Sequence, residues 1–355
     1  MLTILSVGYP LAPVSSGTAG GAEQVLSMLD EALADAGHRS VVVAPIGSNC
    51  RGTLLPISAP PLQLGDEQRR RAWRETRAAI RSALARFSVD VVHLHGIDFL
   101  EYLPEPGPPV VATLHLPPSW YPEHAYRLSR PETYLICVSN SQRRECRPHA
   151  QIEMVIPNGI RLSGLAVTQE KRNYVVALGR VCPEKAFHLA VDAADKAGIP
   201  LVLAGTVFGY TAHQNYFRDV LAPKLHSPHR FIGAVGGYRK RELLANARCL
   251  LVTSTVSETS SLVAMEAMAC GTPVIAFRCG ALPEIVQHGR TGFLVDTPDE
   301  MADAIAAAGE LSPRLCREHA EKNFSADRMA ERYFDLYRAV SAEYASHDVQ
   351  QEHAS

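Results

Sequence analysis

The segment from Leu250 to Ala276 reads LLVTSTVSETSSLVAMEAMACGTPVIA, and its pattern predicts a strand, a helix and a second strand in that order. An apolar run comes first, small polar residues follow it, and apolar residues then recur at helical spacing as far as a glycine. The second apolar run begins at Val274. A helix that joins two buried apolar strands is typical of a βαβ unit, in which both strands lie parallel in one sheet.

The same alternation of apolar runs and helix-length amphipathic stretches extends over the whole chain. Continuous apolar runs joined by helical crossovers favour doubly wound parallel sheets with buried strands. The predicted strands are Leu2–Val7, Ser40–Ala44, Val89–Leu94, Val110–Leu114, Tyr134–Val138, Met154–Ile156, Tyr174–Leu178, Leu201–Ala204, Arg230–Ile232, Leu250–Thr253, Val274–Ala276 and Gly292–Val295.

These strands are too many for one doubly wound domain, and 355 residues suffice for two domains of roughly 150 residues each. The stretch from Asn158 to Asn173 is polar, contains glycine and lacks a clear period, so it is the expected seam. We expect an N-terminal Rossmann-like domain over residues 1–165 and a second over 166–327. A helix over 328–345 is expected to pack back on the first domain, and a cleft between two domains is a common place for a ligand.

Composition excludes several classes of protein. A net charge of −2 argues against a nucleic-acid-binding protein, which is normally basic. The eight cysteines are scattered without zinc-type spacing, so we expect reduced thiols and no metal. The N-terminus lacks the pattern of a signal peptide, and no apolar run approaches the ~18 residues of a membrane span. We therefore expect a cytoplasmic protein, at most peripheral at the inner face of the membrane.

The residues around the first quoted helix suit a diphosphate ligand. Ser260 or Ser261 is a natural N-cap, and the free amides of a helix start attract anions. Glu258 precedes the helix and could reach a sugar hydroxyl, whereas Glu266 lies about one turn into it and could accept bonds from a ribose. From spacing alone, a solvated loop acid and a helix-surface acid remain the simpler interpretation.

From Glu258 to Asp296 the chain resembles glycosyltransferase family 4. The shared pattern is a pair of glutamates separated by seven residues, then EAMACGTPVIA from Glu266 and GALPEIVQHGRTGFLV from Gly280. The resemblance implies the GT-B fold, in which two Rossmann-like doubly wound α/β domains face each other across a cleft. It also implies that Glu258 approaches the donor sugar and that Glu266 binds the ribose of the nucleotide.

The chain departs from the family pattern directly after Glu258. Family members usually have Gly-Phe-Gly there, whereas this chain has Thr259, Ser260 and Ser261 before Leu262. The backbone amides of these four residues can still line the phosphates and the sugar. The added side chains narrow the pocket, so the usual pose of a donor sugar does not transfer directly.

A second element that suits a diphosphate is GRVCPEK, which follows the predicted strand Tyr174–Leu178. By residue type alone, Arg180 and Lys185 would be surface cations. The segment resembles the G-R-x-x-x-x-K element of the family, whose arginine and lysine hold the diphosphate. The turn before Val235 resembles the family's turn beside the nucleobase, which implies a backbone contact from this residue to the base.

The N-terminal half carries a glycine-rich turn after its first strand and a histidine at the end of a later one. Gly20 and Gly21, with Gly17, resemble the family's glycine loop over the donor phosphate and the acceptor, although such a turn could be a simple loop. His115 follows the strand Val110–Leu114 at the edge where such sheets bind ligands. A lone histidine is more often structural, but family members carry one here, near the sugar carbon. We interpret His93 and His95 as fold residues.

A helix is predicted from Arg69 to Phe87. Its apolar face holds Trp73, Ile80, Leu84 and Phe87. Beside this face runs an arginine stripe, formed by Arg70, Arg74, Arg77 and Arg81. A solvated charged face is the simpler interpretation, and contact with an anionic acceptor or a membrane surface is the alternative.

These features together predict a retaining hexosyl-type glycosyltransferase with a nucleoside diphosphate sugar as co-substrate, no other cofactor and a hydroxyl acceptor. Arg180, Lys185 and the helix start would stabilise the departing diphosphate, which makes a metal unnecessary. The resemblance implies that the leaving phosphate deprotonates the acceptor and that Glu258 positions the sugar. Two alternatives remain: a phosphorylase or epimerase on the same fold, and a non-catalytic nucleotide-sugar-binding protein. The residues do not specify the base, the sugar or the acceptor.

Overall fold

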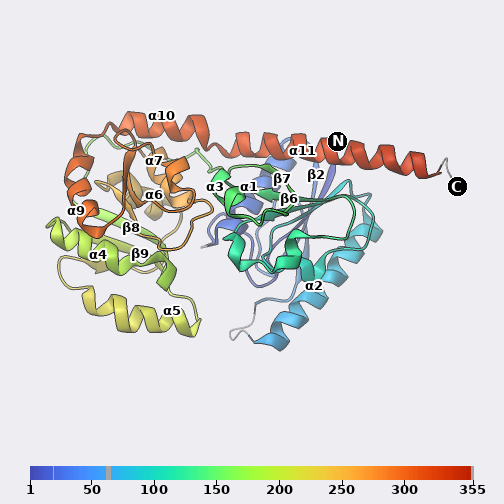
Figure 1. The fold of residues 1–355 in the computed structure, drawn as a ribbon, viewed down its shortest axis with the longest axis horizontal. Helices are drawn as coiled ribbons and strands as arrows, with labels where there is room; N and C mark the ends of the chain where they lie inside the picture. Colours follow the sequence, from blue (N-terminus) through green and yellow to red (C-terminus); the bar gives the residue numbers. More distant parts are fainter. Residues whose placement is uncertain (19, 61–64, 353–355) are drawn as a thin grey trace. The chain divides into compact units, whose positions relative to one another are not determined.

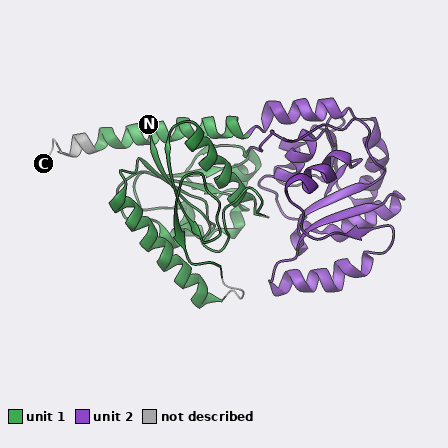
Figure 2. Ribbon diagram, turned by 180° about the vertical axis from the view of Figure 1, so that it is seen from behind, with its two compact units in different colours: residues 1–158, 326–355 green, residues 159–325 purple. Residues whose placement is uncertain are grey.

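The computed structural model describes residues 1–18, 20–60 and 65–352. The chain forms two compact units (Figure 2). The first unit takes Met1–Asn158 together with the C-terminal segment that begins at Ala326, and the second unit takes Gly159–Ser325. The division therefore lies at the N-terminal end of the polar stretch Asn158–Asn173, seven residues before the boundary expected after residue 165.

The first unit is built on a seven-stranded sheet in which every neighbouring pair is parallel (Figure 1). The strands in sheet order are β3 (Thr53–Ile57), β2 (Arg39–Pro45), β1 (Thr3–Val7), β4 (Val91–Leu94), β5 (Val110–Leu114), β6 (Thr133–Cys137) and β7 (Ile152–Val155). The order reverses between β1 and β4, as in a doubly wound sheet.

Helices cover both faces of this sheet. They are α1 (Gly21–Asp35), α2 (Asp66–Arg86), α3 (Asn140–Glu145), α11 (Ala326–Glu352) and the short η1 (Phe99–Tyr102), η2 (Pro118–Trp120) and η3 (Glu123–Tyr126). Val41 and Val43 of β2 lie in one apolar cluster with Ile80 of α2, whereas Val42 packs with Leu26 of α1. Successive side chains of a strand point to opposite faces, so α2 and α1 lie on opposite sides of the sheet. The C-terminal helix α11 contacts α1 and β4.

Each predicted strand of the first unit is present, but the sequence analysis missed β3. This strand contains Pro56 and pairs with β2 alone, at the edge of the sheet. Proline lacks an N–H group and is confined largely to edge strands, so a run that contains it is a poor candidate for a strand. Its exposed and half-buried positions also break the apolar run that marks the other strands.

The second unit repeats this design with a six-stranded, fully parallel sheet. Its strands in sheet order are β10 (Arg230–Phe231), β9 (Leu201–Thr206), β8 (Val175–Arg180), β11 (Leu250–Val252), β12 (Val274–Phe277) and β13 (Gly292–Val295). Its helices are α4 (Phe187–Lys196), α5 (Thr211–Asn215), α6 (Gly237–Asn246), α7 (Leu262–Ala269), α8 (Leu282–Ile285), α9 (Pro298–Ala307), α10 (Pro313–Asn323) and the short η4 (Pro183–Lys185), η5 (Tyr216–Leu221), η6 (Ala222–Lys224) and η7 (Ala308–Glu310).

Alternate residues of the central strands of this unit face two separate cores. Leu250 and Val252 of β11 pack with residues of α6, α7 and α10, whereas Leu251 packs with residues of α4 and α9. Both faces are therefore buried, which explains why the strand reads as a continuous apolar run. Among the described residues, none of the helices has the length and apolar character that crossing a membrane requires.

Candidate active site

The predicted donor-binding residues gather at one edge of the second sheet. The strand order reverses between β8 and β11, which pair directly with each other. Arg180 ends β8 and Lys185 lies in the loop that follows it, whereas Glu258 lies in the loop after β11. The crevice outside the carboxyl ends of strands at such a switch point is where open α/β sheets bind ligands.

Lys185 and Glu258 form an ion pair through Lys185 Nζ and Glu258 Oε1. The Glu258 carboxylate also accepts a hydrogen bond from the Ser254 hydroxyl. The Glu258 side chain is 10% exposed and that of Lys185 is 23% exposed. Neither group is the solvated surface charge of the simpler interpretation, and the two sequence motifs meet at this contact.

Hydrogen bonds to backbone carbonyls join the loop after β8 to the segment after β11. The Thr253 hydroxyl donates to the carbonyl of Lys185 at 2.8 Å, and the Thr255 amide donates to the carbonyl of Glu184 at 2.9 Å. These bonds fix the backbone of the segment that carries Lys185. The position of Lys185 is therefore set by the strand end of β11 as well as by its own loop.

A glycine of the family-like motif holds the backbone of Glu258 from the other side. Gly280 has a φ of +54°, and a Cβ at this position would collide with the backbone nitrogen and carbonyl oxygen of Glu258. The amide of Ala281 donates to that carbonyl at 2.6 Å. Glycine is required here both for the left-handed conformation and for the close approach.

The start of α7 differs from the sequence prediction in its capping. Ser261 occupies the N-cap position, but its side chain makes no capping hydrogen bond. Its ψ of 89° departs from the extended value near 159° at Ser139, which caps α3 by accepting from the Gln142 amide. The predicted serine therefore lies at the N-cap position of α7, but the side-chain hydrogen bond of a cap is absent.

Two further hydroxyl residues line this turn. Ser260 Oγ is buried and has no hydrogen-bond partner among the described residues, and Thr259 is 8% exposed. A buried unsatisfied hydroxyl costs about 1–3 kcal/mol, and a ligand hydroxyl could satisfy it. The helix that starts next, at Leu262, has eight residues and no acidic group in its first turn.

Glu266 lies on α7 and pairs with Lys240 of α6, which the sequence analysis missed. Lys240 Nζ is 2.7 Å from Oε1 and 2.6 Å from Oε2 of Glu266. The side chains are 19% and 16% exposed, so Glu266 is not a solvated surface acid. Lys240 is 26 positions earlier in a polar helix, and no local pattern marks it as a partner.

The other donor-side predictions lie at the same edge of the second sheet. Arg180 is half-buried where β8 ends. Val235 is half-buried in the loop between β10 and α6, and its contact with a base stays a prediction. The neighbouring turn is fixed by a hydrogen bond from the Gly205 amide to the carbonyl of Gly233 at 2.9 Å.

In the first unit, the predicted glycines lie in the loop after β1. Gly20 is the N-cap of α1 and Gly21 is its first residue. A Cβ at Gly20 would collide with the buried carboxylate of Glu23, which folds back over this position. No described atom lies within 4 Å of the position that a Cβ at Gly17 would occupy, so close packing does not require a glycine here.

His115 belongs to a group of three histidines at the ends of β4 and β5. His95 Nδ1 is 3.0 Å from His115 Nε2, and the two rings stack with centroids 5.3 Å apart. His93 instead bonds Tyr337 of α11 at 2.7 Å and Thr113 at 2.8 Å. His93 is thus a fold residue, as interpreted, whereas His95 contacts the predicted catalytic histidine directly.

The histidine group is uncharged at neutral pH. Burial lowers the pKa of His115 to about 3, and it lowers the pKa of His93 and of His95 well below 6.5. A neutral imidazole can donate one hydrogen bond and accept another, but it brings no positive charge. His115 is therefore suited to orient a hydroxyl and is a weak base.

The arginine stripe lies on α2, which begins at Asp66, three residues before the predicted start at Arg69, and ends at Arg86, one residue before the predicted end. Arg70, Arg74 and Arg81 are exposed. Arg77 is half-buried and donates from Nη1 to the carbonyl of Glu101. On the apolar face of the helix, Trp73 Nε1 donates to Asp98 Oδ2 at 2.5 Å.

Two family models match consecutive parts of the chain. The model described as "Glycosyltransferase Family 4" matches residues 19–163, and the model described as "Glycosyl transferases group 1" matches residues 166–323. Together they account for most of the sequence. The chain belongs to glycosyltransferase family 4.

Named relatives of this family 4 chain are glycosyltransferases. A phosphatidyl-myo-inositol mannosyltransferase of Mycobacterium tuberculosis (strain ATCC 25618 / H37Rv) is 27% identical over 335 residues, which cover 83% of this chain and 84% of the relative. A D-inositol 3-phosphate glycosyltransferase of Mycobacteroides abscessus is 33% identical over 178 residues, covering 48% of this chain and 40% of the relative. This chain spans half or less of the length of the D-inositol 3-phosphate glycosyltransferases that it matches.

Solved structures share the fold of this family 4 chain. AviGT4, a glycosyltransferase involved in avilamycin A biosynthesis, is 26% identical with a TM-score of 0.71, over 96% of this chain and 98% of that one. Anabaena Alr3699/HepE in complex with UDP-glucose is 19% identical with a TM-score of 0.74, over 96% of this chain and 100% of that one. With the two parallel sheets, these likenesses confirm the predicted GT-B class of fold.

Proposed function

We propose that this family 4 protein transfers a hexosyl group from a nucleoside diphosphate sugar to a hydroxyl acceptor, with retention at the anomeric carbon. The observation that carries the proposal is the ion pair of Lys185 with Glu258 at the switch point of the second sheet. In this proposal the lysine of the pair serves the diphosphate and the glutamate serves the sugar. The UDP and UDP-glucose complexes of Alr3699/HepE support a nucleotide-sugar donor.

The donor side divides into three tasks. Arg180 and Lys185 neutralise the diphosphate, and the backbone amides from Thr259 to Leu262 contact its oxygens or the sugar. Glu266 accepts hydrogen bonds from the ribose while Lys240 holds its carboxylate in place. Charge-assisted bonds of this kind contribute about 1.5–3 kcal/mol each.

In the transfer step, the bond between the anomeric carbon and the diphosphate oxygen breaks as the acceptor oxygen attacks the same face of the sugar. The acceptor proton passes to an oxygen of the leaving diphosphate, whose new negative charge Arg180 and Lys185 stabilise. Glu258 positions the sugar and stabilises positive charge at the ring. No covalent sugar–enzyme intermediate is part of this proposal.

His115 and the glycine loop of the first unit serve the sugar and the acceptor in this proposal. The low pKa of His115 keeps its ring neutral, so it orients a hydroxyl and does not pair with the phosphate charge. Gly17, Gly20 and Gly21 allow a close approach of backbone to the ligand. In this proposal the reaction uses neither a metal nor a cofactor besides the donor, because Arg180 and Lys185 neutralise the leaving group.

The decisive experiment combines a ligand screen with a transfer assay. Nucleoside diphosphates and their sugars are first ranked by the rise in Tm that they cause. The best donor is then incubated with inositol phosphates and simple polyols, in buffer containing a chelator, and the anomeric configuration of the product is read by NMR. The names of the relatives make inositol-containing acceptors the first to test.

The outcomes separate the proposal from its rivals. A retained product whose formation falls at least 100-fold in Glu258→Gln supports it. Product formed only with inorganic phosphate indicates a phosphorylase, and a changed sugar without an acceptor indicates an epimerase. Tight nucleotide binding without nucleotide release indicates a non-catalytic binding protein, and an inverted product contradicts the proposed stereochemistry.

A further inference from the structure

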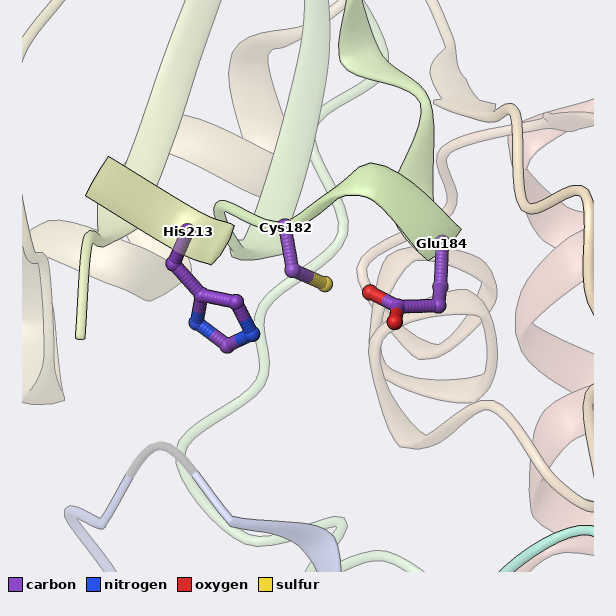
Figure 3. A group of neighbouring side chains, drawn as sticks. All are labelled: Cys182, Glu184 and His213. Atoms are coloured by element: carbon purple, nitrogen blue, oxygen red, sulfur yellow. The ribbon is translucent and has the colours of Figure 1, made fainter. Parts of the chain in front are cut away.

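Cys182, Glu184 and His213 come together beside the loop that carries Arg180 and Lys185. Each of the three residues offers one ligand atom, and these atoms all lie within 4.8 Å of one another. Figure 3 shows the thiol of Cys182 between the imidazole of His213 and the carboxylate of Glu184. Cys182 and Glu184 belong to the segment after β8, whereas His213 comes from α5.

The backbone on the cysteine side of this cluster is held in place. Lys185 donates from its amide to the carbonyl of Cys182 at 3.2 Å, and Thr255 donates to the carbonyl of Glu184 at 2.9 Å. Cys182 is 1% exposed, and its thiol donates to the carbonyl of Arg180 at 3.6 Å and also interacts with the Glu184 carboxylate. Two of the three ligand side chains are thus positioned before any ion arrives, which lowers the entropic cost of binding.

The imidazole of His213 is positioned by aromatic neighbours. Its ring meets Tyr210 edge-on at 5.1 Å and Phe208 edge-on at 6.3 Å. In Figure 3 its Nε2 is the ring nitrogen on the side of Cys182 and Glu184. An imidazole nitrogen placed in this way can serve as a metal ligand through its lone pair.

We propose that Cys182, Glu184 and His213 bind a divalent cation of the Zn²⁺ type. Thiolate, imidazole and carboxylate are the three ligand types that Zn²⁺ takes in proteins, whereas Mg²⁺ and Ca²⁺ prefer oxygen alone. On binding, the Cys182 thiol releases its proton to solvent, and the thiolate and carboxylate charges balance the two positive charges of the ion. Three protein ligands leave a fourth tetrahedral position for water.

The bound ion would act on the loop and takes no part in the transfer step. It links the segment between Arg180 and Lys185 to α5, so its occupancy restrains the residues that face the diphosphate. This inference concerns metal binding alone and is tested without a sugar donor. Its failure would leave the proposed transfer reaction untouched.

The test is a Co²⁺ titration of the full chain, freed of metal by a chelator and kept reduced by a phosphine. Co²⁺ reports thiolate coordination through a near-ultraviolet charge-transfer band. We expect one equivalent to produce this band and Zn²⁺ to abolish it by displacement. The amides of Val181, Cys182, Glu184, Lys185 and Ala186 should exchange hydrogen more slowly once Zn²⁺ is bound.

Ligand variants and matched controls decide the assignment. Cys182→Ser should lose the band, and His213→Gln should weaken Zn²⁺ binding by about 100-fold or more, since even indirect partners contribute 10–100-fold. Cys50→Ser and His226→Gln, at half-buried and exposed positions outside the cluster, should bind like the parent.

Three results would overturn the proposal: no band in the parent protein, a band that persists in Cys182→Ser, or unchanged Zn²⁺ affinity in His213→Gln. The measurement on His213→Gln tests the proposal even if Cys182→Ser fails to fold. His213 is only partly buried, so its replacement should not prevent folding.

Discussion

The ammonium group of Lys185 lies against the carboxylate of Glu258, so residues from two separate sequence motifs form one charge pair. Glu258 is nearly buried, and its carboxylate also accepts a hydrogen bond from the Ser254 hydroxyl. Withdrawing both charges from water is costly, and their contact offsets this cost only while both are present. Replacing only one of the two residues therefore leaves an unpaired charge, which should lower the free energy of unfolding of the second unit.

We predict that Lys185→Met destabilises the protein by about 3 kcal/mol, because it leaves the Glu258 carboxylate buried without a counter-charge. The double variant Lys185→Met/Glu258→Gln should recover more than half of the loss, since glutamine is neutral. Urea unfolding followed by far-ultraviolet circular dichroism measures both values. Additive losses in the double variant would show that the pair contributes nothing to stability.

A second prediction concerns Glu266 and the lysine that holds it. Glu266→Ala should weaken binding of the best nucleoside diphosphate by at least about 10-fold, because the ribose loses a charge-assisted acceptor. Lys240→Met should weaken it less, through a misplaced carboxylate. Isothermal titration calorimetry measures the nucleotide affinity of both single variants and of the double variant. The three values give the coupling free energy between Lys240 and Glu266.

If Lys240 acts through Glu266, the double variant binds no more weakly than Glu266→Ala. A further loss in the double variant would mean that Lys240 contacts the nucleotide by itself. An affinity for nucleotide that Glu266→Ala leaves unchanged would make the ribose role of Glu266 wrong.

The fold was predictable because its strands are buried on both faces. Such strands leave continuous apolar runs, as at Leu250–Val252, whereas the edge strand Thr53–Ile57 contains Pro56 and was missed. The loops that carry Lys185 and Glu258 were found because each follows a strand. Their direct contact was not predicted, since it depends on which strands are neighbours in the sheet.

The partners of the site residues were the part that sequence could not supply. Lys240 meets Glu266 from another helix, and His95 meets His115 from another strand. Neither contact follows from a period or a motif, because packing in three dimensions creates it. Ser261 occupies the predicted N-cap position, but residue type alone did not indicate that its side chain makes no capping hydrogen bond.

A third prediction concerns the arginine stripe, which we expect to be a solvated face. The variant Arg70→Ala/Arg74→Ala/Arg81→Ala keeps Arg77, because this residue bonds the carbonyl of Glu101. Each basic residue that faces an anionic membrane contributes about 1 kcal/mol, so a membrane-binding stripe would lose roughly 100-fold in affinity. We expect equal co-sedimentation of parent and variant with phosphatidylserine vesicles. Salt-sensitive binding by the parent that the variant lacks would contradict this.

The last prediction is a pH dependence of the first unit. The pKa of His115 is lowered to about 3 by burial, whereas an unfolded histidine has a pKa near 6.5. Between these values the unfolded state binds a proton that the folded state does not, so the free energy of unfolding falls as the pH falls. The contribution of His115 is fully present above pH 6.5, and lowering the pH from 7.5 to 5 removes about 2 kcal/mol. His93 and His95, whose pKa values are also lowered, act in the same direction.

Tryptophan fluorescence during urea unfolding measures this effect on the first unit alone, because Trp73 and Trp120 are the two tryptophans of the chain and both belong to that unit. His115→Gln should reduce the difference in unfolding free energy between pH 7.5 and pH 5 by about 2 kcal/mol, whatever its effect at pH 7.5. His124→Gln alters an exposed histidine of the same unit and should leave the difference unchanged. If His115→Gln keeps the full pH dependence, His115 is charged in the folded protein, and it would then be suited to pair with the donor phosphate instead of orienting a hydroxyl.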